Sequence, residues 1–229
     1  MLVLAHRGAN RRAPENTLAA FSAARALGAD GVELDVRLSA DGVAVVRHDA
    51  ATPAGPVAGL SFAALRGADP ALPTLAEALD ACAGLLVNVE IKNQPGEPDW
   101  DPTERAAEVV VAQLAARGVA DDVLVSSFSL ATVDRVLALA SAVPTALLTV
   151  GVDPLAALAS AESHGHRALN PHVASLAGPV AGALTARAHE LGVRVFAWTV
   201  NDPEDVRRLA TAGVDGVITD VPEVAVAAR

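Results

Sequence analysis

The sequence predicts an α/β barrel in which eight parallel strands alternate with helices. Three observations lead to this fold class. Eight short apolar runs are bounded by turn-forming residues, as buried parallel strands are. Segments of helical period rich in Ala, Leu, Val and Arg separate these runs. A chain of 229 residues suits one closed barrel without edge strands, so we expect residues 1–229 to form a single (β/α)8 TIM barrel domain.

The predicted elements alternate regularly along the chain. The eight strands are expected at residues 2–6, 31–36, 85–92, 123–128, 145–150, 167–170, 193–198 and 215–220. The helices are expected at residues 17–27, 74–82, 103–117, 129–140, 153–163, 178–191 and 203–212, followed by a short C-terminal helix. This alternation is typical of βα units, whose helices cover the outer face of a parallel sheet.

The second βα connection is much longer than the others. It runs from the end of the second strand to the helix that begins near Thr74, and it contains a turn at Asp41-Gly42. Its last part, residues 50–73, is rich in Pro, Gly and Ala. Long insertions in the βα loops of compact domains are usually functional, so we expect residues 50–73 to form a cap within the barrel domain.

Composition and charge exclude several classes of protein. The net charge of −10 leaves no basic stripe for phosphate backbones, which argues against nucleic acid as a partner. No apolar run approaches the ~18 residues of a membrane span, so stable membrane insertion is not expected. No signal peptide follows Met1, which makes a cytoplasmic protein the expectation. The sequence indicates no protein partner. Cys82, the single cysteine, lies in an apolar run and is expected to be a buried thiol.

Carboxylates interrupt two neighbouring apolar strands. Glu33 and Asp35 alternate with aliphatic residues, so both acids share one strand face, and Glu90 lies near the end of the next strand. Barrel active sites lie at the carboxyl ends of the strands, where these acids would converge. Two like charges ~4 Å apart cost on the order of 4 kcal/mol at an effective dielectric constant near ~20. We therefore expect a divalent cation, Mg²⁺ or Ca²⁺, as oxygen ligands favour; a structural network with Arg7 and Lys92 is the alternative.

Two histidines are expected beside the same mouth. His6 ends the first strand and His48 lies in the long connection. Because imidazole changes charge near neutral pH, one histidine could accept a proton from an attacking hydroxyl while the other protonates a leaving oxygen. Arg7 and Lys92 are candidate phosphate contacts. Trp198, at a strand end, is expected to form a pocket wall. This set of residues suits phosphodiester cleavage.

Other polar residues have simpler interpretations. Asn16 or Thr17 is expected to cap the first helix, and Thr219 and Asp220 to begin the terminal helix rather than contact a ligand. His172 follows the sixth strand, and the sequence leaves open whether it reaches the mouth. Three histidines on or beside helical segments are expected at the surface: His164, His166 and His189.

Several motifs, in order along the chain, resemble those of the glycerophosphodiester phosphodiesterase family. They are HRGANRRAPENT (6–17), ELDVRLSADGVAVVRHD (33–49), NVEIK (88–92), SSF (126–128) and RVFAWTVNDPEDVRRLATAGVDGVITDVP (194–222). Their joint occurrence is far more specific than any one of them. The resemblance implies a TIM-barrel hydrolase that cleaves glycerophosphodiesters, small-molecule substrates, to glycerol 3-phosphate and an alcohol with a divalent metal.

The resemblance also implies roles for matching residues. Glu33, Asp35 and Glu90 match metal-binding acids, His6 and His48 the acid/base pair, Arg7 and Lys92 phosphate contacts, and Trp198 a wall of the substrate pocket. The nucleophile is either water or the glycerol 2-hydroxyl, which would give a cyclic phosphate first. Which histidine is the acid stays open.

One segment departs from the family pattern. Residues 50–73 are shorter and less polar than the usual insertion, so we expect a reduced cap and a more open mouth. Two alternative functions remain: a lysophospholipase D-like lipid phosphodiesterase, and a non-catalytic barrel that binds phosphorylated ligands. The first would need an exposed apolar rim near the insertion, for which the candidates are Pro56, Val57, Leu60 and Phe62.

Overall fold

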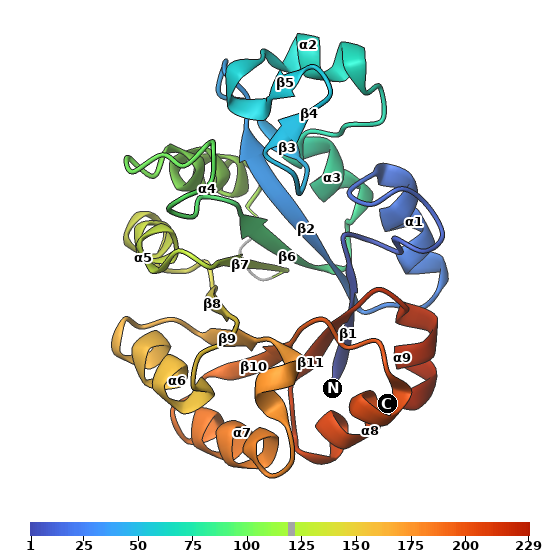
Figure 1. The fold of residues 1–229 in the computed structure, drawn as a ribbon, viewed down its shortest axis with the longest axis vertical. Coiled ribbons are helices and arrows are strands. Elements are labelled where there is room, and N and C mark those ends of the chain that lie inside the picture. The colour runs from blue at the N-terminus through green and yellow to red at the C-terminus, as the bar shows by residue number, and fades with distance from the viewer. Residues whose placement is uncertain (119–121) are drawn as a thin grey trace.

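A closed barrel forms the centre of the computed structural model, which describes residues 1–118 and 122–229 (Figure 1). Within these residues one sheet has the order β1-β11-β10-β9-β8-β7-β6-β2-β3, and an additional pairing of β1 with β2 closes eight parallel strands into a barrel. The predicted TIM barrel is confirmed. Its strands are β1 (Leu2–His6), β2 (Gly31–Leu38), β6 (Leu86–Ile91), β7 (Val123–Ser127), β8 (Thr145–Thr149), β9 (Ala168–Pro171), β10 (Arg194–Ala197) and β11 (Gly216–Thr219).

Helices surround the barrel on its outer side (Figure 1). Side chains fix where several of them begin: the hydroxyl of Thr17 accepts a hydrogen bond from Ala20 N at 3.2 Å, so Thr17 is the predicted cap of the first helix. None of the described helices is long and apolar enough to cross a membrane. The helices are α1 (Leu18–Ala26), α3 (Leu75–Ala81), α4 (Arg105–Arg117), α5 (Leu130–Leu139), α6 (Pro154–Ser163), α7 (Val180–Glu190), α8 (Pro203–Thr211) and α9 (Pro222–Ala228).

The barrel interior is apolar towards the amino-terminal ends of the strands. Close packing there explains a glycine: a Cβ on Gly216 would lie 2.5 Å from the ring of Phe196. The outward-facing aliphatic residues pack against the helices, and Cys82 is fully buried among them, as predicted. Burial raises the pKa of its thiol to about 12. The inner cluster comprises Leu4, Leu124, Ala146, Ala168, Phe196 and Ile218.

The second βα connection forms a small lobe beside α3, at the top of Figure 1. β3 (Ala44–Val46) runs antiparallel to β2, followed by the hairpin of β4 (Ala51–Thr52) and β5 (Gly55–Pro56), the 3₁₀ turn η1 (Val57–Gly59) and α2 (Phe62–Ala68). The lobe has its own buried cluster of Val45, Val57, Leu65 and Leu72. The predicted insertion is present, with more secondary structure than its composition indicated.

Candidate active site

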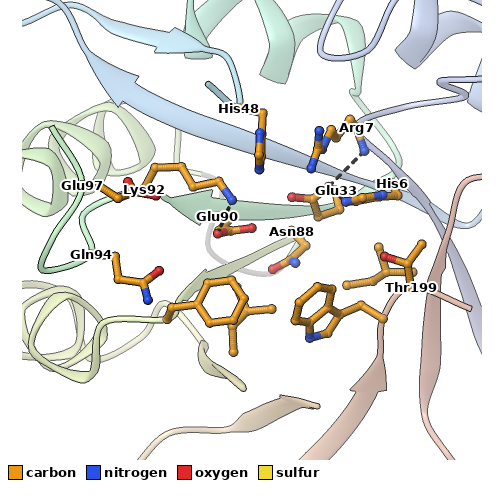
Figure 2. Close-up of a pocket in the computed structure, with 14 residues that line it drawn as sticks. His6, Arg7, Glu33, His48, Asn88, Glu90, Lys92, Gln94, Glu97 and Thr199 are labelled. Carbon is orange, nitrogen blue, oxygen red and sulfur yellow. Dashed lines mark hydrogen bonds and ion pairs between the residues drawn. The ribbon is translucent and has the colours of Figure 1, made fainter. Parts of the chain in front are cut away.

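A cavity of about 390 Å³ opens at the carboxyl ends of the barrel strands (Figure 2). Seven of the eight predicted site residues line it, and the eighth, Asp35, is 1 % exposed and contacts Arg7 and Lys92 of the lining. The other lining residues include Asn88, Gln94, Glu97 and Thr199, which sequence reasoning did not assign to the site. The seven are His6, Arg7, Glu33, His48, Glu90, Lys92 and Trp198.

The three predicted acids converge, all of them buried. Glu33, Asp35 and Glu90 each place a carboxylate oxygen within 4.8 Å of the others. The register of the parallel pair β2 and β6 brings them together, because Asp35 lies opposite Glu90 and Glu33 opposite Asn88. We call Glu33, Asp35 and Glu90 the acid trio below.

Two cations partly balance the acid trio. The Nζ of Lys92 lies 2.6 Å from Glu90 Oε1 and 3.1 Å from Asp35 Oδ1, and Arg7 Nε lies 3.3 Å from Asp35 Oδ2. Burial raises the pKa of Asp35, but Lys92 and Arg7 together lower it further, so it falls below its usual value. Burial raises the pKa of Glu90 to about 7 despite Lys92. Burial, Asp35 and Glu90 raise the pKa of Glu33 well above its usual range.

The acid trio fits a hard divalent cation. Its ligands are all oxygens, as Mg²⁺ and Ca²⁺ prefer. Glu33 Oε1 is buried and has no hydrogen-bond partner among the described residues, and neither polar atom of the buried Asn88 amide has one. Oxygen acceptors are costly to bury without a partner, and a cation between the carboxylates would satisfy Glu33 Oε1 and could also be reached by Asn88 Oδ1.

Asn16 and Arg7 hold the acid trio from the chain segment after β1. Asn16 Nδ2 donates a hydrogen bond of 2.8 Å to Asp35 Oδ2, so its role goes beyond the helix-capping interpretation. The backbone N–H of Arg7 donates to Glu33 Oε2 at 2.9 Å, and its guanidinium donates to both carboxylate oxygens of Glu15 at 3.0 Å. Arg7 and Lys92, the two predicted phosphate contacts, therefore both face acids in this structure.

The imidazole of His6 contacts a carboxylate through its Nδ1. Its Nδ1 lies 2.7 Å from Asp220 Oδ1, and its Nε2 lies 3.9 Å from Glu33 Oε2. Burial raises the pKa of Asp220, but hydrogen bonds from His6, Asn10 and Asn201 lower it further, to well below its usual range. The expectation that Thr219 and Asp220 begin the terminal helix is wrong, because Val221 is its N-cap and Asp220 turns back to His6.

His48 has a similar arrangement on the lobe side of the cavity. Its Nδ1 lies 2.9 Å from Asp49 Oδ1, and its carbonyl oxygen accepts a 2.7 Å hydrogen bond from Arg37 Nε. Arg37 is itself buried and paired with Glu97 and Asp99, which anchors the loop that carries His48. Figure 2 shows His48 pointing into the cavity that His6 and the acids also face.

The sequence model of the glycerophosphoryl diester phosphodiesterase family matches residues 6–224, which is nearly the whole chain. The chain belongs to this family. The predicted family and enzyme class, a phosphodiester hydrolase that acts on glycerophosphodiesters, are thereby confirmed. The matched residues include every predicted site residue.

Full-length relatives and solved structures agree with this membership. A glycerophosphodiester phosphodiesterase of Caldanaerobacter subterraneus is 33 % identical, over 97 % of this chain and 95 % of the relative. The crystal structure of the glycerophosphodiester phosphodiesterase of Thermotoga maritima has a TM-score of 0.86 and 29 % identity, covering 100 % of this chain and 98 % of the other. An Oleispira antarctica phosphodiesterase, solved with the product sn-glycerol-3-phosphate, has a TM-score of 0.86 and 28 % identity, covering 100 % and 96 %.

An aromatic wall faces the acids across the cavity of this phosphodiesterase. Trp198 packs edge-to-face against Phe128, with ring centroids 5.4 Å apart, and its indole N–H donates a 2.8 Å hydrogen bond to Asn170 O. His172 packs against the same indole, with centroids 4.9 Å apart, but does not line the cavity. His172 thus lies at the mouth end of β9 beside Trp198, next to the cavity rather than in its lining.

The three histidines predicted at the surface divide into two groups. His164 and His189 are exposed, as expected. The expectation for His166 is wrong, because only 2 % of this residue is exposed. Gly165, with φ of 84°, ends the turn after α6, and the side chain of the next residue, His166, lies against Asp134 of α5 and Thr145 of β8.

Proposed function

We propose that this phosphodiesterase hydrolyses glycerophosphodiesters to glycerol 3-phosphate and an alcohol with one divalent cation, Mg²⁺ or Ca²⁺, held by the acid trio, and with His6 and His48 as the acid/base pair. One observation carries the proposal: the three buried acids and two imidazoles are gathered at one cavity. Each imidazole also contacts a carboxylate through its Nδ1. The Oleispira antarctica relative with bound sn-glycerol-3-phosphate supports the product class.

The charged residues of the cavity would bind the phosphodiester. A divalent cation, when bound, neutralises negative charge on the phosphoryl group and lowers the pKa of a nearby hydroxyl. Lys92 and Arg7 lie on either side of Asp35, at 3.1 and 3.3 Å, where their remaining N–H groups can donate to nonbridging oxygens. The apolar wall at Trp198 and Phe128 excludes water from the opposite side.

The two imidazoles would move the protons. A carboxylate at Nδ1 fixes the ring orientation and favours the tautomer whose Nε2 is free. One histidine removes the proton of the nucleophile as its oxygen attacks phosphorus, and the other donates a proton to the alcohol oxygen as its bond to phosphorus breaks. The nucleophile is either water or the glycerol 2-hydroxyl; the latter gives a cyclic phosphate that water then opens.

Chelation and substitution of one acid test this proposal. Release of glycerol 3-phosphate from glycerophosphocholine should stop in the chelated enzyme and return with Mg²⁺ or Ca²⁺, whereas Glu33→Ala should stay inactive. Glu108→Ala is the matched control, because Glu108 is an exposed acid paired with Arg135 on the outer side. Unchanged turnover in the chelated enzyme or in Glu33→Ala would remove the cation from the proposal. Single-turnover ³¹P NMR would detect a cyclic phosphate.

A second candidate substrate is a lysolipid, and one surface feature favours it. Val150, Val152 and Leu155 are 54, 52 and 45 % exposed and follow β8 at the end of the barrel where the cavity opens. Of the four rim candidates on the insertion, Val57 is fully buried, whereas Pro56 is exposed and Leu60 and Phe62 are partly exposed. Comparing choline release from glycerophosphocholine and from lysophosphatidylcholine distinguishes the two substrates. The substitution Val152→Asp should reduce the release from lysophosphatidylcholine only. If neither substrate is turned over, the result would favour the non-catalytic barrel that binds phosphorylated ligands.

A further inference from the structure

A second cluster of metal-ligand side chains lies outside the barrel, away from the cavity. Asp134 on α5 and His164 and His166 after α6 each place one ligand atom within 4.8 Å of the others. The Nδ1 of His164 lies 3.0 Å from the carboxylate of Asp134, and the Nε2 of His166 lies 3.2 Å from it. His166 precedes β9 and contacts Thr145, the first residue of β8, so the cluster lies near the amino-terminal ends of the strands, opposite the acid trio.

The chain segment His-Gly-His brings the two imidazoles together. His164 is the C-cap of α6, Gly165 follows with φ of 84°, and His166 N donates to Ala161 O at 2.9 Å. This αL turn closes the helix and fixes the backbone of both histidines. Their rings are nearly parallel, with an interplanar angle of 19° and centroids 6.1 Å apart.

One ring nitrogen of His166 has an incomplete set of contacts among the described residues. Its side chain is fully buried, and its Nδ1 lies 2.9 Å from the Thr145 hydroxyl, which fixes the ring. Its Nε2 points towards Asp134 but makes no hydrogen bond of good geometry with any described residue. A buried imidazole nitrogen oriented by a hydrogen bond at its other nitrogen is typical of metal-binding histidines.

We propose that Asp134, His164 and His166 bind a Zn²⁺-class transition ion, with water at the fourth position. Two imidazoles and one carboxylate are a ligand set that zinc uses. Ligands at ~2.0–2.1 Å from a tetrahedral ion lie roughly 3.3 Å apart, close to the observed 3.0 and 3.2 Å. Burial lowers the pKa of His166, which keeps its imidazole in the neutral form that binds metal. The ion would join α5 to the turn after α6.

Zinc titration of the chelator-stripped full chain tests this site. Mg²⁺ is added in excess to fill the cation site proposed at the acid trio, and binding of added Zn²⁺ is then measured by calorimetry. Wild type should bind one equivalent, and Zn²⁺ should raise the midpoint of thermal unfolding. His164→Ala and Asp134→Asn, both changes of residues that are at least partly exposed, should weaken Zn²⁺ binding at least tenfold. His189→Ala is the matched control, because His189 is exposed and lies 3.0 Å from Asp215 in a histidine–aspartate pair to which the described residues add no third ligand.

A spectrum with Co²⁺ separates this site from the acid trio. Visible absorption bands of imidazole-bound, tetrahedral Co²⁺ should appear in wild type and His189→Ala and disappear in His164→Ala. Phosphodiesterase turnover with Mg²⁺ should be unchanged in His164→Ala. Equal Zn²⁺ affinity and equal Co²⁺ spectra in wild type, His164→Ala and Asp134→Asn would overturn the proposal and leave the cluster as a hydrogen-bonded ion pair.

Discussion

Asp220 Oδ1 lies 2.7 Å from His6 Nδ1, although 214 residues separate them in the chain. The contact exists because β1 and β11 are neighbouring parallel strands, whose carboxyl ends carry these two residues. Asp220 also accepts hydrogen bonds from Asn10 and Asn201, so its orientation is fixed from three sides. The pair therefore joins the carboxyl ends of β1 and β11 beside the cavity, which His6 lines.

Replacing Asp220 by Asn should reduce kcat about 100-fold with little change in KM. The amide keeps the shape but no longer stabilises the charged imidazole, and the contribution of a positioned acid or base is about 10²–10⁴-fold. Steady-state kinetics on glycerophosphocholine measure this. Glu223→Gln is the control, since Glu223 pairs with Arg12 at the surface of the same terminal segment. An unchanged kcat in Asp220→Asn would show that the carboxylate does not assist His6.

The pH dependence of kcat/KM should assign the two histidines. A base must be deprotonated and an acid protonated, so wild type should show a bell-shaped profile. Replacing the base by Ala should remove the acidic limb, and replacing the acid should remove the alkaline limb, each with a loss of about 10²–10⁴-fold. Profiles of His6→Ala and His48→Ala over the same range measure this. Two variants that keep both limbs of the bell would exclude the paired mechanism.

Replacing Asn16 by Gly should weaken divalent cation binding about 10- to 100-fold, as loss of groups that orient metal ligands does. Asn16 has φ of 57°, which Gly adopts without strain, so this change isolates the loss of the amide that orients Asp35. Calorimetric titration with Mg²⁺ or Ca²⁺ measures it. Thr17→Ala is the control in the same motif: it should lower stability by about 1 kcal/mol through the lost cap but leave cation affinity unchanged. Equal affinities in both variants would contradict the positioning role.

The ion pair between Arg66 and Glu77 should stabilise the lobe in a pH-dependent way. The Glu77 carboxylate accepts hydrogen bonds from the Arg66 guanidinium and from the Thr74 N–H. These bonds, that of Arg66 most of all, lower the pKa of Glu77 from 4.5 to about 2. Because the folded-state pKa is depressed, this stability is present above pH ~4.5 and is lost as pH falls towards about 2.

Glu77→Gln keeps the capping box but removes the charge. Since the pair is partly exposed, wild type should be more stable at pH 7 by less than about 1 kcal/mol, and the difference should shrink at pH 3. Urea unfolding midpoints at both values measure it. A difference that grows with acid would contradict the linkage.

The barrel could be predicted because each of its elements is periodic in the sequence. The eight strands lie within two residues of their predicted positions, since alternation of aliphatic residues and terminal glycines marks them locally. The helix α2 was not predicted: it lies in the segment rich in Pro, Gly and Ala, and packing of Leu65 against Val45 and Val57 stabilises it.

The sequence by itself determined the barrel, the family and the convergence of the acid trio, because strand parity and the common edge of parallel strands follow from backbone geometry. Only the tertiary structure decided which groups contact and orient these residues. The contact of Asp220 with His6, the contact of Asn16 with Asp35 and the burial of His166 depend on loops from distant parts of the chain that lie together in the closed barrel. Such contacts join distant segments through side-chain hydrogen bonds, and a hydrogen bond leaves no periodicity in the sequence by which to recognise it.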